Sequence, residues 1–293
     1  MNWPTGSIVE PMADEQAISV RGLRKSYGAT TAVAGVDLEV RRGEVFALLG
    51  PNGAGKTTTV EILEGYRKRD GGEVTVLGTD PAHGDAAWRA RVGIVLQGTG
   101  EFDDLTVGEV VRHFARFYPN PADPTAIIEK VGLTEKIRSR THSLSGGQKR
   151  RLDVALGIVG RPELLFLDEP TTGFDPAARR EFWELIRDLS AGGTTILLTT
   201  HYLYEAEALA DRVGVIAAGR LVAVDAPERL GDRASAPATV SWRDDGVTKS
   251  EHTPTPTALV TELAARYGGE VPELTVARPT LEDVYLEMIG EGS

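Results

Sequence analysis

A glycine-rich loop at residues 50–57 (GPNGAGKT) carries the clearest chemistry in this 293-residue chain. It follows an apolar run at residues 45–49 and precedes residues 58–66, which have helical character. In such a loop glycines let backbone N–H groups approach phosphates, Lys56 can reach the terminal phosphates, and the Thr57 hydroxyl can ligate Mg²⁺. The full pattern arises by chance about once in a hundred chains of this length. We therefore favour a nucleotide phosphate site over an ordinary glycine turn.

Two acidic residues, Asp168 and Glu169, end a second apolar run at residues 164–167. The carboxyl end of a buried strand is where α/β sheets bind phosphates. There, Asp168 can hold Mg²⁺ through water, and Glu169 can orient or deprotonate an attacking water. The alternative is that the two acids only cap a turn, and the upstream phosphate loop disfavours it.

The pentapeptide LSGGQ at residues 144–148 precedes a helix that we expect to begin near Lys149. A serine and two glycines at a helix N-terminus form a second anion site. One nucleotide needs one such site per chain, so we infer that this one serves the nucleotide of another copy. A simple capped helix is the alternative, and the position of the pentapeptide between the phosphate loop and the acidic residues disfavours it.

The elements that must position these residues form an α/β pattern with a mainly parallel sheet. Helices are expected between about 98 and 160, above all at 107–117 and 125–131. The expected strands of the first part are residues 18–27, 32–40, 44–49, 164–167 and 195–199, with an amphipathic helix at 177–189 before the last of them.

The composition changes near Gly231, and we expect a small appended α+β domain from there to the end. Residues 1–16 are expected to form a poorly ordered leader. The appended domain is predicted as a strand at 238–242, a Pro/Thr-rich turn, a helix at 258–267, a strand at 273–277 and a helix at 281–289.

Composition and charge exclude several classes of protein. The chain has no cysteine, which removes disulfides and thiolate metal sites. Its net charge is −11, and residues 231–293 hold 5 basic and 11 acidic side chains, which argues against a nucleic-acid footprint. The apolar runs are far shorter than the roughly 18 residues of a bilayer-spanning helix, so we expect the chain not to cross a membrane by itself.

The ordered motifs resemble the ATP-binding subunits of ABC transporters over about residues 18–230. Residues 171–176 (TTGFDP) and 278–285 (RPTLEDVY) resemble the antibiotic-resistance exporter ATPases of the daunorubicin/doxorubicin type. The implied fold class is an α/β P-loop NTPase of the ABC ATPase type, with an N-terminal antiparallel β subdomain and a helical signature subdomain at about 98–160. The implied domains are the leader (1–16), the ATPase domain (17–230) and an accessory or dimerisation domain (231–293).

The resemblance implies roles for single residues. Tyr27 would stack on adenine, Gln97 would lie near Mg²⁺ and the transport subunit, Asp175 would link the two sites of a dimer, and His201 would hold the γ-phosphate and the attacking water. Taken singly, Tyr27 and His201 are more often packed core residues. The implied catalytic residues are Lys56, Glu169 and His201, and the implied metal-binding residues are Thr57, Gln97 and Asp168. The implied nucleotide-binding residues are Tyr27, Gly50, Pro51, Asn52, Gly53, Ala54, Gly55, Lys56, Thr57, Thr58, Gln97, Ser145, Gly146, Gly147, Gln148 and Asp175.

The expected function is ATP hydrolysis with Mg²⁺ that energises a separate transmembrane permease, with export of a drug, antibiotic or other hydrophobic compound. The chain would act as a homodimer at the cytoplasmic face of a bacterial membrane. The permease would dock on residues 98–106, where an exposed Phe102 or Leu105 would fit. The alternatives are a soluble ABC ATPase acting on nucleic acid, an importer ATPase and a nucleotide-binding module without turnover. We expect no nucleic-acid partner, and Glu169 and His201 argue for turnover.

Overall fold

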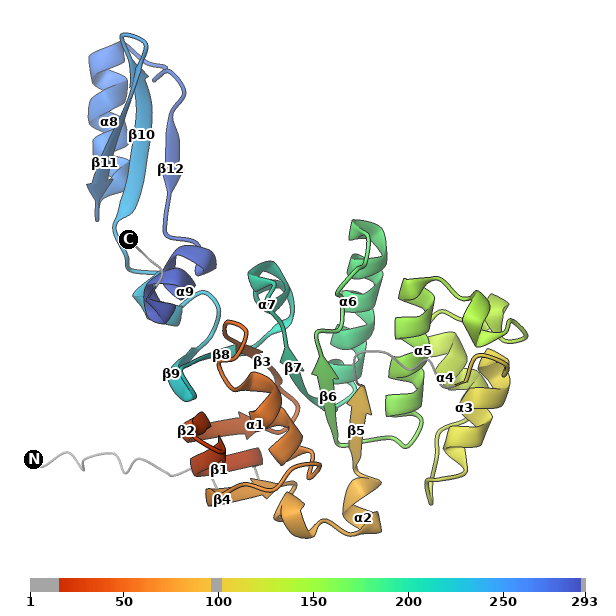
Figure 1. The fold of residues 1–293 in the computed structure, drawn as a ribbon. Helices are drawn as coiled ribbons and strands as arrows, with labels where there is room; N and C mark the ends of the chain where they lie inside the picture. Colours follow the sequence, from red (N-terminus) through yellow and green to blue (C-terminus); the bar gives the residue numbers. More distant parts are fainter. Residues whose placement is uncertain (1–15, 96–101, 291–293) are drawn as a thin grey trace, which may run out of the picture.

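The computed structural model describes residues 16–95 and 102–290, so Gln97 and the expected leader lie outside the described residues apart from Gln16. Its central sheet has the strand order β5-β6-β7-β3-β8-β9, parallel except for β9 (Figure 1). This confirms the predicted mainly parallel core. The strands are β3 (Val45–Leu49), β5 (Val92–Val95), β6 (Leu164–Asp168), β7 (Thr195–Thr199), β8 (Arg212–Ala217) and β9 (Arg220–Asp225).

The central sheet separates two hydrophobic cores. Because successive side chains of a strand point to opposite faces, Val45 and Ala47 of β3 join one core, and Phe46 and Leu48 join the other. The first core also contains side chains from the helices α3 to α7. Both faces are covered, which explains why β3, β6 and β7 are continuous apolar runs.

The second core is closed by an antiparallel sheet of order β2-β1-β4, which confirms the predicted N-terminal β subdomain. Its strands are β1 (Gln16–Tyr27), β2 (Thr30–Arg41) and β4 (Gly71–Val76). The helices of the molecule are α1 (Lys56–Leu63), α2 (Ala86–Arg89), α3 (Val107–Ala115), α4 (Pro124–Lys130), α5 (Gly146–Ile158), α6 (Pro176–Ala191), α7 (Leu203–Leu209), α8 (Pro256–Tyr267) and α9 (Leu281–Ile289).

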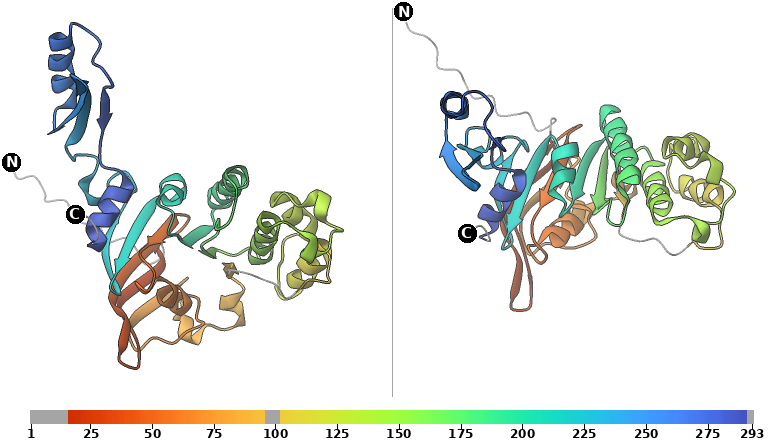
Figure 2. Two further views of the ribbon diagram at one scale, coloured as in Figure 1. Left: turned by 45° about the horizontal axis from the view of Figure 1, so that its top comes forward. Right: turned by 90° about the horizontal axis from the view of Figure 1, so that it is seen from above.

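The C-terminal part holds a sheet of order β11-β10-β12. The helix α8 packs on this sheet, with Leu263 of α8 against Val240 and Trp242 of β10. Its strands are β10 (Ala238–Asp244), β11 (Val247–Thr253) and β12 (Thr275–Ala277). This sheet and α8 project from the rest of the molecule (Figures 1 and 2). The Pro/Thr-rich turn predicted between residues 242 and 258 is wrong, because residues 247–253 of this segment form the strand β11. The signal was present, because Asp245 (φ 48°) and Gly246 (φ 81°) form the two-residue turn that a tight hairpin requires.

The last helix, α9, returns to the part of the molecule that holds the central sheet and packs against β8, α7 and the 3₁₀ turn at Leu230–Asp232. Leu281 is 1% exposed and belongs to the same core as Leu209 and Leu230. Leu281 and Val284 of α9 are buried within the chain, and Tyr285, Met288 and Ile289 are half-buried against the core that holds Leu281. The dimer contact expected of residues 231–293 stays a prediction.

An ion-pair cluster around Glu163 gives the fold a measurable pH dependence. Glu163 accepts hydrogen bonds from Arg91 (Nε, 2.5 Å) and Arg42 (Nη1, 2.9 Å), and these partners, Arg91 first, lower the pKa of Glu163 from 4.5 to about 2. A pKa that is lower in the folded state adds stability above the unfolded pKa, and this stability is lost as the pH falls towards the folded pKa.

We therefore expect Glu163→Gln to lower the free energy of unfolding by about 1 kcal/mol at pH 7, a figure reduced because the carboxylate is partly exposed to solvent. The difference from the wild type should shrink as the pH falls from 5 to 3, as measured by urea unfolding. Glu129→Gln, at an exposed position of α4, is the control and should behave like the wild type throughout. A difference that is the same at every pH would contradict the assigned pKa.

Candidate nucleotide-binding site

The loop between β3 and α1 can be built only with glycine at several positions. Gly53 (φ 79°) and Gly55 (φ 103°) have left-handed backbones. A Cβ on Gly55 would lie 2.4 Å from the carbonyl oxygen of Ala32, and one on Gly50 would lie 2.3 Å from that of Ile216. The backbone of the loop therefore lies in close contact with the backbones of β2 and β8 of the same chain.

Lys56 begins α1 and folds back over the loop. Its ammonium donates hydrogen bonds to the carbonyl oxygens of Gly50 (2.6 Å) and Pro51 (3.1 Å), and the side chain is buried. Burial lowers the pKa of Lys56, while the charges of Glu169 and Asp168 act in the opposite direction. The positive charge of Lys56 therefore lies between the loop and the carboxylates of Asp168 and Glu169.

The carboxyl ends of β6 and β7 place the acidic residues beside the loop. Asp168 accepts a hydrogen bond from the Thr199 hydroxyl, and the Glu169 amide donates to the Thr199 carbonyl oxygen at 3.1 Å. Glu169 itself has φ +43°, an uncommon conformation for a residue other than glycine. Its Oε1 lies 3.1 Å from Nδ1 of His201, which follows β7 and is 44% exposed. His201 is therefore a surface residue in contact with Glu169.

One pocket of about 300 Å³ joins the loop to the acidic residues. It includes Thr57 and Asp168, whose hydroxyl and carboxylate oxygens are the hard donors that Mg²⁺ prefers. Ala32 in β2 also lines it, although no motif in the sequence marks this residue. The full lining is Ala32, Asn52, Gly53, Gly55, Lys56, Thr57, Thr58, Asp168 and Glu169.

Tyr27, Asp175 and the signature residues 144–148 were predicted as site residues but lie outside this pocket in the described structure. Tyr27 ends β1 and is 42% exposed, with Lys25 Nζ 5.5 Å and the guanidinium of Arg67 5.2 Å from its ring centroid. It is not a core residue. Asp175 caps α6 by accepting hydrogen bonds from the amides of Ala177 and Ala178, both at 2.9 Å.

The signature residues 144–148 lie at the N-terminus of α5, where Ser145 and Gly146 are exposed and Leu144 is buried. Ser145 and Gln148 make a reciprocal capping box, with hydrogen bonds of 3.3 and 3.0 Å. Within the described residues, none of the five lines the phosphate pocket of the same chain. The helix is nevertheless tied to the acidic strand, because Arg150 donates to the carbonyl oxygens of Asp168 and Pro170.

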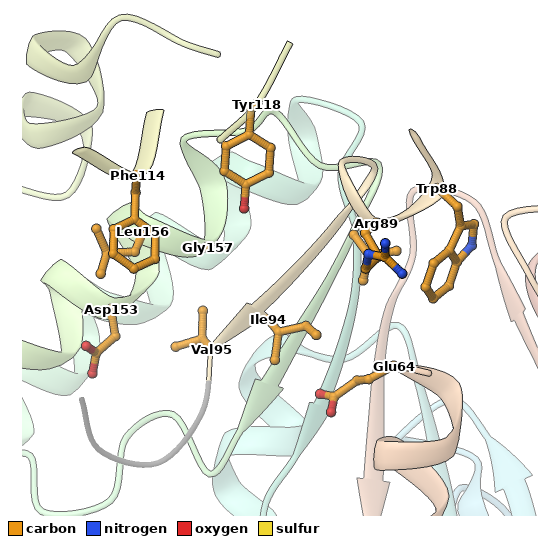
Figure 3. Close-up of a pocket in the computed structure, with 11 residues that line it drawn as sticks. Glu64, Trp88, Arg89, Ile94, Val95, Phe114, Tyr118, Asp153, Leu156 and Gly157 are labelled. Atoms are coloured by element: carbon orange, nitrogen blue, oxygen red, sulfur yellow. The ribbon is translucent and has the colours of Figure 1, made fainter. Parts of the chain in front are cut away.

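A second pocket, of about 380 Å³, lies between β5 and the helices α3 and α5 (Figure 3). Its wall is mostly apolar, and it contains the carboxylates of Glu64 and Asp153. Burial and the nearby charge of Asp168 raise the pKa of Glu64 to about 7. Beside α3, Phe102 is half-buried against Phe114 (centroids 5.4 Å apart), and Leu105 is exposed.

A parallel sheet with a phosphate loop, an acidic pair and a histidine at neighbouring strand ends defines a P-loop ATPase. A family model described as ABC transporter matches residues 33–172. The chain is 37% identical over 309 residues to a daunorubicin resistance ATP-binding protein of Streptomyces coeruleorubidus, covering 96% of this chain and 98% of that protein. It is 46% identical over 219 residues to a Nod factor export ATP-binding protein of Ralstonia nicotianae, covering 73% and 68%.

Solved structures agree with this assignment. A subunit of an ABC transporter complex from Clostridium perfringens has a TM-score of 0.68 at 29% identity, covering 73% of this chain and 90% of that one. An ATP-binding subunit of an ABC transporter has a TM-score of 0.69 over 93% of this chain and 99% of that one, at 23% identity. The chain belongs to the ATP-binding proteins of ABC transporters, and it is an ATPase of that type. Of the helices in the described ranges, none has the length and hydropathy that crossing a bilayer requires.

Proposed function

We propose that this chain hydrolyses ATP with Mg²⁺, in a site completed by a second copy, and so drives a separate membrane permease that exports a drug, antibiotic or other hydrophobic compound. The observation that carries this proposal is the meeting of Lys56, Asp168, Glu169 and His201 at adjoining strand ends. The relatives named above are export and resistance proteins, which favours export over import or action on nucleic acid.

Each group has a task in the hydrolysis. The loop amides and Lys56 would hold the terminal phosphates, and Thr57 and Asp168 would hold Mg²⁺, which neutralises phosphate charge when bound. Gln97 is proposed as a further metal contact. Glu169 would accept the proton of the attacking water, and His201, fixed through Nδ1 to Glu169, would face the γ-phosphate. Tyr27 offers an exposed ring on which adenine can stack.

The composite site rests on the position of the signature residues. Ser145 and Gly146 are exposed and lie outside the pocket of their own chain, so an anion at this helix N-terminus would come from another molecule. A head-to-tail pair of chains would place Ser145 and Gly147 on the γ-phosphate of the partner. Asp175 would lie near the contact between the two sites.

The permease would dock on residues 98–106, of which 102–106 belong to the described part of the chain, and on the second pocket, whose apolar wall suits an amphipathic helix and whose carboxylates suit a basic residue on it. Phe102 packs against Phe114 of this pocket, and Leu105 is exposed. This arrangement would place the chain on the cytoplasmic face of a bacterial membrane. Residues 231–293 would be an accessory domain.

Purification of the full-length chain from its native membranes tests the proposal, with identification of the proteins and nucleic acids that accompany it. We expect a polytopic membrane protein and ATP-dependent phosphate release. A nucleic-acid partner without a membrane protein would contradict the transport role, and the absence of phosphate release from that complex would contradict turnover.

A further inference from the structure

Arg179 in α6 connects two segments of the site that are remote in sequence. Its guanidinium carbon lies 4.8 Å from the ring centroid of Tyr204 and 5.9 Å from that of Tyr202. Its Nη2 donates a hydrogen bond to the carbonyl oxygen of Phe174 at 3.3 Å. One half-buried side chain thus contacts the residue before Asp175 and the two tyrosines after His201.

We propose that Arg179 is a positioning residue for ATP hydrolysis, which holds His201 in place through the two tyrosines and ties it to the segment around Asp175. The proposal rests on the proposed function, because it assumes that His201 acts on the γ-phosphate.

The aromatic rings carry the connection from Arg179 to the reacting groups. The rings of Tyr202 and Tyr204 are stacked, with centroids 5.3 Å apart and planes at 25°. The ring of Tyr202 lies 4.0 Å from that of His201, and Nδ1 of His201 lies 3.1 Å from Oε1 of Glu169. A cation over an aromatic face restricts the ring, and the ring in turn restricts the imidazole.

The other end of the connection is also fixed. Phe174 is buried, and its ring meets that of Phe182 edge to face at 5.6 Å. The next residue, Asp175, caps α6. A displacement of this segment by an approaching second copy would therefore reach His201 through the guanidinium of Arg179.

Tyr204 is followed in the chain by a buried carboxylate, Glu205, which is 0% exposed and accepts a hydrogen bond from the indole of Trp183 at 3.5 Å. Burial raises the pKa of Glu205, and the side chains of Thr200, Thr171 and Trp183, followed by the charge of Arg179, act in the opposite direction. Arg179 Nε and Glu205 Oε2 are buried without a hydrogen-bond partner among the described residues. Removing the cation therefore also affects folding, so a second pair of variants is needed.

The test uses Arg179→Met, Tyr204→Leu and Tyr204→Phe in the purified full-length chain. We expect Arg179→Met and Tyr204→Leu each to lower kcat about tenfold or more, with KM and ATP affinity within about twofold, because misplacing a catalytic group slows chemistry more than binding. Tyr204→Phe keeps the ring and should keep kcat. The double variant Arg179→Met with Tyr204→Leu should be no slower than either single variant, because both changes break the same connection. Arg180→Met, an exposed neighbour on α6, is the control.

The proposal is overturned if Arg179→Met and Tyr204→Leu keep kcat within twofold, if ATP affinity falls as much as kcat, or if the two losses add in the double variant. Should Arg179→Met not fold, as judged by its thermal midpoint, the comparison of Tyr204→Leu with Tyr204→Phe decides alone. Failure of the proposed function is seen separately, because the wild-type chain would then release no phosphate.

Discussion

Replacing Glu169 by glutamine is expected to lower the rate of ATP hydrolysis by about a thousandfold while ATP affinity stays within about twofold. The amide has the shape of the carboxylate and can still meet His201, but it cannot accept the proton of the attacking water. Glu169 lines the phosphate pocket without belonging to the loop that holds the phosphates, so binding should survive. ATP that binds without being hydrolysed should hold two chains together, so the variant should accumulate as a nucleotide-bound dimer.

Phosphate release at saturating ATP and light scattering with and without ATP measure the two effects of Glu169→Gln. Glu184→Gln, an exposed position of α6, controls for the loss of one negative charge and should retain wild-type values. Wild-type turnover in purified Glu169→Gln would remove the assigned role of this residue.

Replacing Lys56 by alanine is expected to weaken ATP binding itself, by about a hundredfold, or about 3 kcal/mol. The Lys56 ammonium is buried among the loop carbonyl oxygens and faces the two carboxylates. Without it, the triphosphate would bring its charge next to Asp168 and Glu169 with no cation from the protein to offset the repulsion.

Titration calorimetry with Mg²⁺ and ATP measures this loss. Lys68→Ala is the matched control, because Lys68 is an exposed basic residue after α1 and its loss should leave the affinity unchanged. Unchanged affinity in Lys56→Ala would contradict the assignment of residues 50–57 as the phosphate loop. Lys56→Ala and Glu169→Gln together separate binding from chemistry, since Lys56→Ala should lose ATP affinity and Glu169→Gln should lose turnover.

The elements that could be predicted from the sequence are those that short-range patterns determine. The strands β3, β6 and β7 were predicted to within one residue, because a strand buried on both faces leaves an uninterrupted apolar run. The phosphate loop was recognisable because its glycines are required by the close approach of other backbone segments, as at Gly55 and Ala32.

Two features could not be predicted from the sequence: an exposed strand without an apolar pattern, and contacts between residues far apart along the chain. Strand β11 is exposed except at Thr253, so it has no alternating apolar pattern, although its turn could have been recognised at Asp245 and Gly246. The contact of Arg179 with Tyr204 joins residues that are close only because α6 and α7 pack side by side on the sheet. No spacing rule relates such residues.

The return of α9 to the ATPase part has a consequence for how the C-terminal region can vary. The chain leaves the core after β9, forms the projecting sheet with α8, and comes back to pack beside the 3₁₀ turn from which it departed. The two ends of the projecting unit therefore lie close together, as they do in a domain that is inserted into a surface loop. Such an insertion can be enlarged, shortened or exchanged between relatives while the nucleotide site stays intact, provided that α9 keeps its place on β8 and α7.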